Sequence, residues 1–264
     1  MSGISKIQGA LAGARILQGK ISMVTGAAAG IGEACARLFA DQGSKVIAVD
    51  MEEDRLERVC GDISESGGGA IAVGADVTDS ADLDRAFRKA TKAFGPLDVL
   101  VNNAGGGRST DFFSISESEW SQVVNLNLTS VFMASRRAAA IFKDRGSGCI
   151  INMSSLAGRS VSVTAGAHYT ASKAGMLGLT RHLARALAPY NVRVNAVCPG
   201  VVNSERLVKR MAEKGTTEEV AHSIPLGRIG DVSEVASVCL FLASDLASYI
   251  TGASLDVNGG AAML

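Results

Sequence analysis

The feature that most constrains the fold is a glycine-rich turn between a short apolar run and a helical pattern. Residues 21–25 have the composition of a buried strand, and residues 33–40 carry apolar positions at helical spacing. The turn between them is Gly26-Ala27-Ala28-Ala29-Gly30-Ile31-Gly32. This order is typical of phosphate binding, because glycine lets the backbone approach a pyrophosphate while the helix N-terminus presents free amides. The turn alone would also suit an S-adenosylmethionine site.

A second strand pattern favours a dinucleotide site over an S-adenosylmethionine site. Residues 45–49 form another apolar run, and it ends in Asp50, 18 residues after Gly32. A carboxylate at this position can accept hydrogen bonds from the ribose hydroxyls of an adenine dinucleotide. The spacing Gly-x-x-x-Gly-x-Gly differs from the common Gly-x-Gly-x-x-Gly fingerprint, and a solvated turn aspartate is the alternative interpretation of Asp50.

Short β-branched runs alternate with longer helical patterns along the rest of the chain, which predicts repeated βαβ units. We therefore expect an α/β fold with one domain, a Rossmann-like doubly wound sheet of seven parallel strands with helices on both faces. Residues 1–16 are expected to form a flexible extension before a domain at 17–264, with a substrate lid at about 201–225. The expected strands are 21–25, 45–49, 70–74, 97–101, 148–153, 192–197 and 254–257, and the expected helices are 31–42, 52–66, 80–94, 117–144, 169–188 and 231–243.

A tyrosine and a lysine four residues apart indicate acid–base chemistry. Tyr169 and Lys173 would share one face of a helix. A tyrosine has an ordinary pKa of about 10, and a neighbouring ammonium lowers it by favouring the phenolate. A drop of roughly three pH units would need about 4 kcal/mol of differential stabilisation. The pair alone is more often an ordinary helix-surface contact.

The motifs together resemble the short-chain dehydrogenase/reductase superfamily, in its single-domain NAD-using form, from about Leu17 to Gly260. One departure is Ser204, where the family often has a threonine that touches the nicotinamide amide. If the family's serine motif aligns one residue earlier, Ser154 and not Ser155 would be the matching serine. The matching motifs are Thr25-Gly26-x-x-x-Gly30-x-Gly32, Asp76-Val77, Asn102-Asn103-Ala104-Gly105, Asn127, Ser155, Tyr169-x-x-x-Lys173 and Pro199-Gly200.

The resemblance implies reversible hydride transfer between a secondary alcohol and a nicotinamide ring. Tyr169 would act as general base or acid, and Lys173 would lower its pKa and hold the nicotinamide ribose. Ser155 would hydrogen-bond the substrate oxygen, while Asn127 would position a proton-relay water and interrupt a long helix. These four residues are the expected catalytic set.

The expected cofactor is NAD. Asp50 would repel the 2′-phosphate of NADP, and the glycine turn holds no cation to compensate. Arg55, the nearest basic residue, is expected to be solvated. No metal is expected, because His168, His182 and His222 lack ligand spacing. The expected cofactor-binding residues are Gly26, Ala29, Gly30, Ile31, Gly32, Asp50, Met51, Asp76, Val77, Asn103, Ala104, Gly105, Tyr169, Lys173, Pro199, Gly200, Val202 and Ser204.

Charge and composition limit the partners. The chain has 26 Lys and Arg residues and 26 Asp and Glu residues, so its net charge is zero. We therefore expect no electrostatic attraction to nucleic acid or to an anionic membrane. No apolar run approaches the roughly 20 residues that span a bilayer, so we expect a cytoplasmic protein. The resemblance implies a small alcohol or ketone as its substrate. The five cysteines are scattered, which is typical of buried reduced thiols. The resemblance, with apolar positions on the helices at 117–144 and from 169, predicts a homotetramer.

Several alternatives remain at this point. Arg108 and Arg159 could bind an anionic substrate group, although exposed arginines are usually solvated. A 3-oxoacyl-carrier-protein reductase shares the motifs but would normally use NADP and a basic docking patch. An epimerase or dehydratase would need a larger substrate domain. A catalytically idle dinucleotide sensor belongs to a different class, and the intact catalytic set argues against it. The sequence does not identify the substrate.

Overall fold

A seven-stranded sheet organises the computed structural model, which describes residues 15–162, 165–205, 207–208 and 217–263. Every strand pairs in parallel with its neighbours, in the order β3-β2-β1-β4-β5-β6-β7. The fold expected from the sequence is therefore confirmed. The strands are β1 (Ile21–Thr25), β2 (Lys45–Asp50), β3 (Gly69–Gly74), β4 (Val99–Asn102), β5 (Gly148–Met153), β6 (Val192–Pro199) and β7 (Ser254–Val257).

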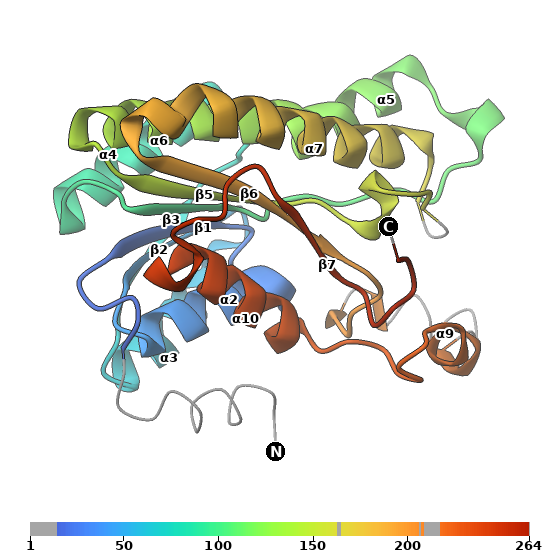
Figure 1. Cartoon of the computed structure of the whole chain (residues 1–264), viewed down its shortest axis with the longest axis horizontal. Coiled ribbons are helices and arrows are strands. Elements are labelled where there is room, and N and C mark those ends of the chain that lie inside the picture. Colours follow the sequence, from blue (N-terminus) through green and yellow to red (C-terminus); the bar gives the residue numbers. More distant parts are fainter. Residues whose placement is uncertain (1–14, 163–164, 206, 209–216, 264) are drawn as a thin grey trace.

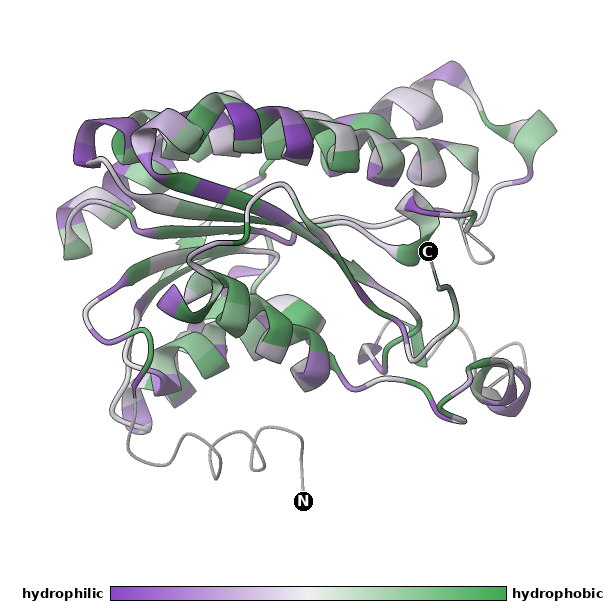
Figure 2. Cartoon of the chain, viewed as in Figure 1, coloured by the Kyte–Doolittle hydropathy of each residue, from purple (hydrophilic) through white to green (hydrophobic). Residues whose placement is uncertain are grey.

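Helices cover both faces of the sheet (Figure 1). One face carries α4 (Ser80–Phe94), α6 (Ser130–Arg145) and α7 (Ala167–Leu187), and the other carries α2 (Gly30–Asp41), α3 (Glu53–Glu65) and α10 (Val232–Ala243). Neighbouring strand residues point to opposite faces, so Met23 and Ile150 join one core whereas Val24 and Ile151 join the other. Hydrophobic residues accordingly line the strands and the inner helix faces (Figure 2).

The boundaries differ from expectation at one long helix. The segment expected as a helix at 117–144 consists of α5 (Glu117–Val124), a π-helical stretch Asn125–Thr129 and α6. A short helix, α9 (Thr217–Ser223), falls within the expected lid and was not foreseen. Residues 1–14 of the expected extension, and residues 206 and 209–216 of the expected lid, lie outside the described residues.

The order of the strands positions the site. After β3 the chain returns past β1 to add β4 on the other side, so the sheet reverses its direction of growth between β1 and β4. In such sheets the connecting loops diverge at this point and leave a crevice beyond the carboxyl ends of the strands. Among the described residues, no helix combines the length and the apolar character that a bilayer crossing requires.

Candidate active site

The glycine turn after β1 is held in a shape that requires glycine at two positions. Gly26 and Gly30 have φ values of 67° and 60°, in the left-handed region that favours glycine. A Cβ on Gly26 would lie 2.9 Å from Ala104 Cα. Asn103 ties the turn to the loop after β4, since its Nδ2 donates to Thr25 O at 3.0 Å and to Gly26 O at 3.1 Å. The turn and that loop therefore form one wall.

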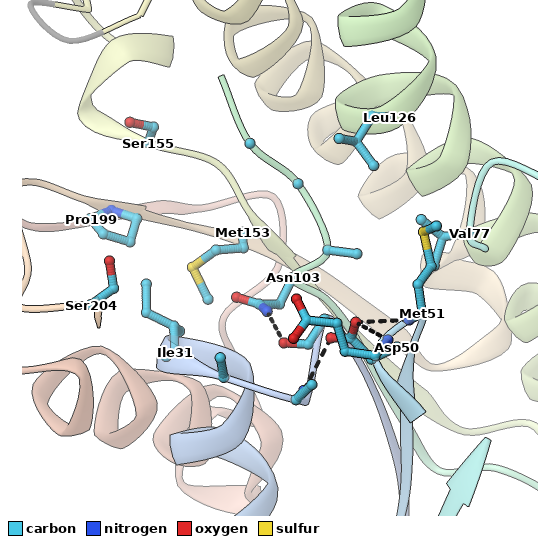
Figure 3. A pocket seen from close by; sticks show the side chains of 18 of the residues that line it. Ile31, Asp50, Met51, Val77, Asn103, Leu126, Met153, Ser155, Pro199 and Ser204 are labelled. Carbon is cyan, nitrogen blue, oxygen red and sulfur yellow. Dashed lines mark hydrogen bonds between the residues drawn. The ribbon is translucent and has the colours of Figure 1, made fainter. Parts of the chain in front are cut away.

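This wall borders a cavity of about 660 Å³ at the carboxyl ends of the strands. Figure 3 shows Asp50, Met51 and Val77 at one end of the cavity and Ser155 and Pro199 toward the other. The structure thus brings together residues that the sequence assigned to the two ends of a dinucleotide. The expected residues among its lining are Gly26, Ala29, Gly30, Ile31, Asp50, Met51, Asp76, Val77, Asn103, Ala104, Gly105, Ser155, Tyr169, Lys173, Pro199, Gly200, Val202 and Ser204.

Asp50 points toward backbone amides at the end of β2. One carboxylate oxygen accepts from Ala28 N at 3.0 Å, and the other accepts from Met51 N at 2.7 Å and Glu52 N at 3.2 Å. The carboxylate is thereby fixed between the glycine turn and the start of α3. The oxygen that accepts from Ala28 has a second lone pair, so these bonds leave room for a ligand hydroxyl.

Arg55 differs from its expected state, because it is ion-paired and not merely solvated. Its guanidinium lies 2.6 Å from a carboxylate oxygen of Glu205 and 3.5 Å from one of Glu52. These carboxylates raise the pKa of Arg55, with the hydrogen bond to Glu205 as the largest contribution. Arg55 and Glu205 both line the cavity, so this cation of the lining is already paired with a carboxylate of the lining.

The Tyr169 and Lys173 side chains lie close together in the lining of the cavity. Lys173 Nζ lies 5.6 Å from the centroid of the Tyr169 ring and donates to Met153 O at 2.7 Å. Lys173 is 3% exposed, and this burial lowers its pKa from 10.5 to about 8. Ser154 is buried and donates its hydroxyl to Lys173 O at 2.9 Å, whereas Ser155 is half-buried and accepts from Ala157 N at 3.1 Å.

Asn127 and Gly32 stand behind the cavity wall and not in its lining. Asn127 is 0% exposed in the π-helical stretch, and its amide exchanges two hydrogen bonds with the Gly106 backbone, at 3.0 and 2.8 Å. It thereby fixes the loop after β4. A Cβ on Gly32 would lie 1.9 Å from Gly26 O, so its glycine is needed for the close approach of α2 to the turn.

A second cavity of about 230 Å³ lies beside Tyr169 and Ser155. Its described lining contains no charged side chain. Arg108 and Arg159 are absent from the described lining of both cavities; Arg108 donates to Gln122 at 3.3 Å and Arg159 pairs with Asp256 at 3.3 Å. The residues that line this second cavity are Gly106, Gly107, Ser155, Leu156, Ala157, Val161, Ser162, Ala165, Tyr169, Pro199, Gly200, Val201, Ser204 and Leu207.

Sequence reasoning missed several residues that line the larger cavity. Ala75 and Met153 directly follow or end strands, so their position beside Asp76 and near Ser155 was a usable signal, whereas Ser154 was considered only as the alternative to Ser155. Arg55 and Glu205 are 150 residues apart, and the sequence around them gave no signal that they would meet. The other lining residues not foreseen are Ala28, Glu52, Gly106 and Leu126. Within the described parts of the chain, no group of three or more His, Cys, Asp or Glu side chains is arranged to hold a metal ion.

Comparison with known proteins agrees with this geometry. Residues 26–262 match the family described as Enoyl-(Acyl carrier protein) reductase. The chain is 38% identical over 245 residues to a 3-oxoacyl-[acyl-carrier-protein] reductase of Thermotoga maritima, covering 92% of this chain and 98% of that protein. It is 38% identical over 251 residues to a 3alpha-hydroxysteroid dehydrogenase of Mediterraneibacter gnavus, covering 93% and 98%.

A solved structure extends the similarity to three dimensions. The crystal structure of a short-chain type dehydrogenase/reductase from Mycobacterium marinum superposes with a TM-score of 0.90 at 32% identity, covering 95% of this chain and 98% of that one. Sequence and fold thus match over nearly the whole length of each protein. The chain belongs to the short-chain dehydrogenase/reductase superfamily of oxidoreductases.

Proposed function

We propose that the protein is an NAD-dependent oxidoreductase that interconverts a secondary alcohol and a ketone, with Tyr169 as general acid and base. The observation that carries the proposal is that Tyr169, Lys173 and Ser155 all line one cavity, in which Ser155 lies toward the end opposite Asp50 (Figure 3). Tyr169 and Ser155 also line the adjoining smaller cavity, where a substrate would meet them.

The residues present fit a dinucleotide. Helix α2 begins after Ala29 without any side-chain cap, so its first amides are open to an anion such as a pyrophosphate. Asp50 stands at the far end of the cavity, where it would accept hydrogen bonds from ribose hydroxyls. Tyr169, Lys173 and Ser204 would face the nicotinamide end. When bound, NAD supplies the hydride acceptor or donor.

The chain's own residues would move the proton. The Tyr169 phenolate takes the proton of the alcohol, and in the reverse direction the phenol returns it to the ketone oxygen. The Lys173 ammonium favours the phenolate through its positive charge, and the Ser155 hydroxyl donates to the substrate oxygen as negative charge develops. Asn127 holds the loop after β4 in place through Gly106 and would position a relay water.

The ion pair between Arg55 and Glu205 supports NAD over NADP. A 2′-phosphate beside Asp50 needs a nearby cation, and Arg55, which lines the same cavity, is already paired with Glu205 and Glu52. Acyl-carrier-protein reductases among the relatives make a ketoreductase of that kind the second candidate. A clear preference for NADP would favour this second candidate.

We further propose that the protein is a cytoplasmic homotetramer. Val123, Val131 and Leu177, which the sequence placed among the apolar positions of the long helices, are buried in the chain's own core. Phe132 remains 46% exposed on α6 and supports an interface there. All five cysteines are free and buried, which fits a reducing compartment.

A substrate panel tests the activity. The residues that are described in the lining of the smaller cavity carry no charge, which favours neutral substrates. The panel therefore pairs neutral secondary alcohols with anionic hydroxy acids and follows the absorbance of the reduced nicotinamide. We expect turnover with neutral alcohols and NAD that is lost in Tyr169→Phe. Binding of NAD without turnover of any member would favour the idle dinucleotide sensor.

A further inference from the structure

The backbone amide of Tyr169 is capped by a neighbouring side chain. Tyr169 is the third residue of α7, where amides lack a carbonyl partner in the preceding turn. The residue before the helix, Gly166, has no side chain to offer. The Tyr169 amide instead lies 2.8 Å from His168 Nδ1, and 3.1 Å from Gly166 O. His168 therefore does from inside the helix what a serine or aspartate does at its start.

The tautomer of His168 follows from its partners. A backbone N–H can only donate, so Nδ1 must be the unprotonated nitrogen and Nε2 carries the proton. Nε2 donates to Glu119 Oε1 at 2.9 Å, and the imidazole is 0% exposed. Glu119 also accepts from Thr110 Oγ1 at 2.5 Å. The hydrogen bond from Thr110, followed by that from His168, lowers the pKa of Glu119 and keeps it ionised.

The surrounding backbone leaves little freedom for this arrangement. A Cβ on Gly166 would lie 2.9 Å from both His168 Cε1 and Thr110 O, so the space of an ordinary capping side chain is already filled. Gly166 N donates to Arg108 O at 2.8 Å. A Cβ on Gly107 would lie 3.0 Å from the Tyr169 ring. The loop after β4 thus contacts the start of α7 at Gly166 and also approaches the Tyr169 ring.

We propose that Glu119 and His168 form a positioning pair that fixes Tyr169 relative to Lys173. The pair acts through the backbone of Tyr169, and neither member lines the described walls of the two cavities. This positioning role rests on the acid–base role that we propose for Tyr169. If the cap is lost, the first turn of α7 loosens and the phenol no longer stays close to the Lys173 ammonium, 5.6 Å from its ring centre.

Two substitutions of His168 separate its two hydrogen bonds. His168→Asn places an acceptor oxygen where Nδ1 lies but does not reach Glu119. His168→Gln reaches Glu119 but has no acceptor beside the Tyr169 amide. Because the chain has three tyrosines, a background of Tyr190→Phe with Tyr249→Phe leaves Tyr169 as the only one. Titration of the tyrosinate absorption band then reports the pKa of Tyr169 in the unliganded protein, without a substrate.

We expect His168→Gln to raise the apparent pKa of Tyr169 by about one unit, toward the ordinary value of about 10. His168→Asn should restore the unmodified value. Glu119→Ala should raise the pKa of Tyr169 when residue 168 is histidine. It should not raise that pKa in the His168→Asn variant, because the asparagine does not contact Glu119. His182→Gln, an exposed histidine on the same helix, is the matched control and should change nothing.

The outcomes separate this inference from the proposed function. Lys173→Met in the same background should also raise the pKa of Tyr169, and an unchanged pKa there would contradict the proposed function itself. If Lys173→Met raises the pKa but His168→Gln does not, the Tyr169–Lys173 pair stands and the positioning role is wrong. Equal effects of His168→Gln and His168→Asn would also overturn it, since loss of packing and not of the cap would be the cause.

Discussion

The buried Lys173 should make stability depend on pH in a way that Lys173→Met abolishes. Burial lowers the pKa of Lys173 from 10.5 to about 8, which corresponds to about 3 kcal/mol against the charged form in the folded protein. Below about pH 8 the lysine is charged in both states and the full penalty applies. Between about pH 8 and 10.5 the unfolded chain binds more protons, so this contribution to stability rises with pH. Above about pH 10.5 the penalty is gone.

Removal of the charge in Lys173→Met should therefore stabilise the folded protein near neutral pH. This stabilisation should disappear at alkaline pH, where Lys173 of the unmodified protein is neutral. The hydrogen bond from Lys173 Nζ to Met153 O is lost as well, at a cost of about 1.5 to 3 kcal/mol that offsets part of the gain. The free energy of unfolding of Lys173→Met minus that of the unmodified protein should fall by about 2 kcal/mol from about pH 7 to about pH 9.5.

Urea unfolding at the two pH values measures this difference. Groups that titrate equally in both proteins cancel in the comparison, and Lys92→Met on the exposed side of α4 is the matched control. A difference between Lys173→Met and the unmodified protein that stays constant over this pH range would refute the reasoning. Lys173 would then titrate alike in the folded and unfolded states.

Three further predictions concern the site and the assembly. Tyr169→Phe should retain NAD binding in a calorimetric titration and lower kcat by about 10²- to 10⁴-fold, and turnover like that of the unmodified protein would remove Tyr169 from the mechanism. The unmodified protein should favour NAD over NADP in kcat/KM by at least about tenfold. The double variant Asp50→Ala with Met51→Arg should narrow this ratio. Equal use of both cofactors by the unmodified protein would argue against a role of Asp50 at the ribose. Light scattering should give the mass of a tetramer, and a monomer at micromolar concentration would contradict the proposed interface.

The sheet could be predicted because each strand carries its own signal. The boundaries of β1, β5 and β7 match the expectation residue for residue, since turn residues border each apolar run. The positions of Asp50, Ser155 and Pro199 followed from the rule that ligands gather at the carboxyl ends of parallel strands. These parts of the site depend on local patterns and on sheet topology, and both are readable in the sequence.

Contacts between distant loops could not be predicted. The pairing of Arg55 with Glu205 depends on how the segment after β6 crosses the cavity, and neither residue has a pattern that specifies the other. The role of His168 also escaped prediction. His168 and Tyr169 are consecutive in α7, so their side chains point to different faces of the helix, yet Nδ1 of His168 contacts the backbone amide of Tyr169. Charge pairs and side-chain caps are set by tertiary geometry.

The π-helical stretch at 125–129 sets the register of α6 on the sheet. The buried positions that run through α5 and α6 occur at Val123, Asn127, Val131, Ala134, Ala138 and Phe142. Phe142 follows Val123 by 19 residues over five turns, whereas five α-helical turns contain about 18. The π turn absorbs this additional residue. The same turn contains Asn127, whose amide exchanges two hydrogen bonds with the Gly106 backbone. The irregularity of the helix and the support of the loop after β4 therefore coincide in one turn of this chain.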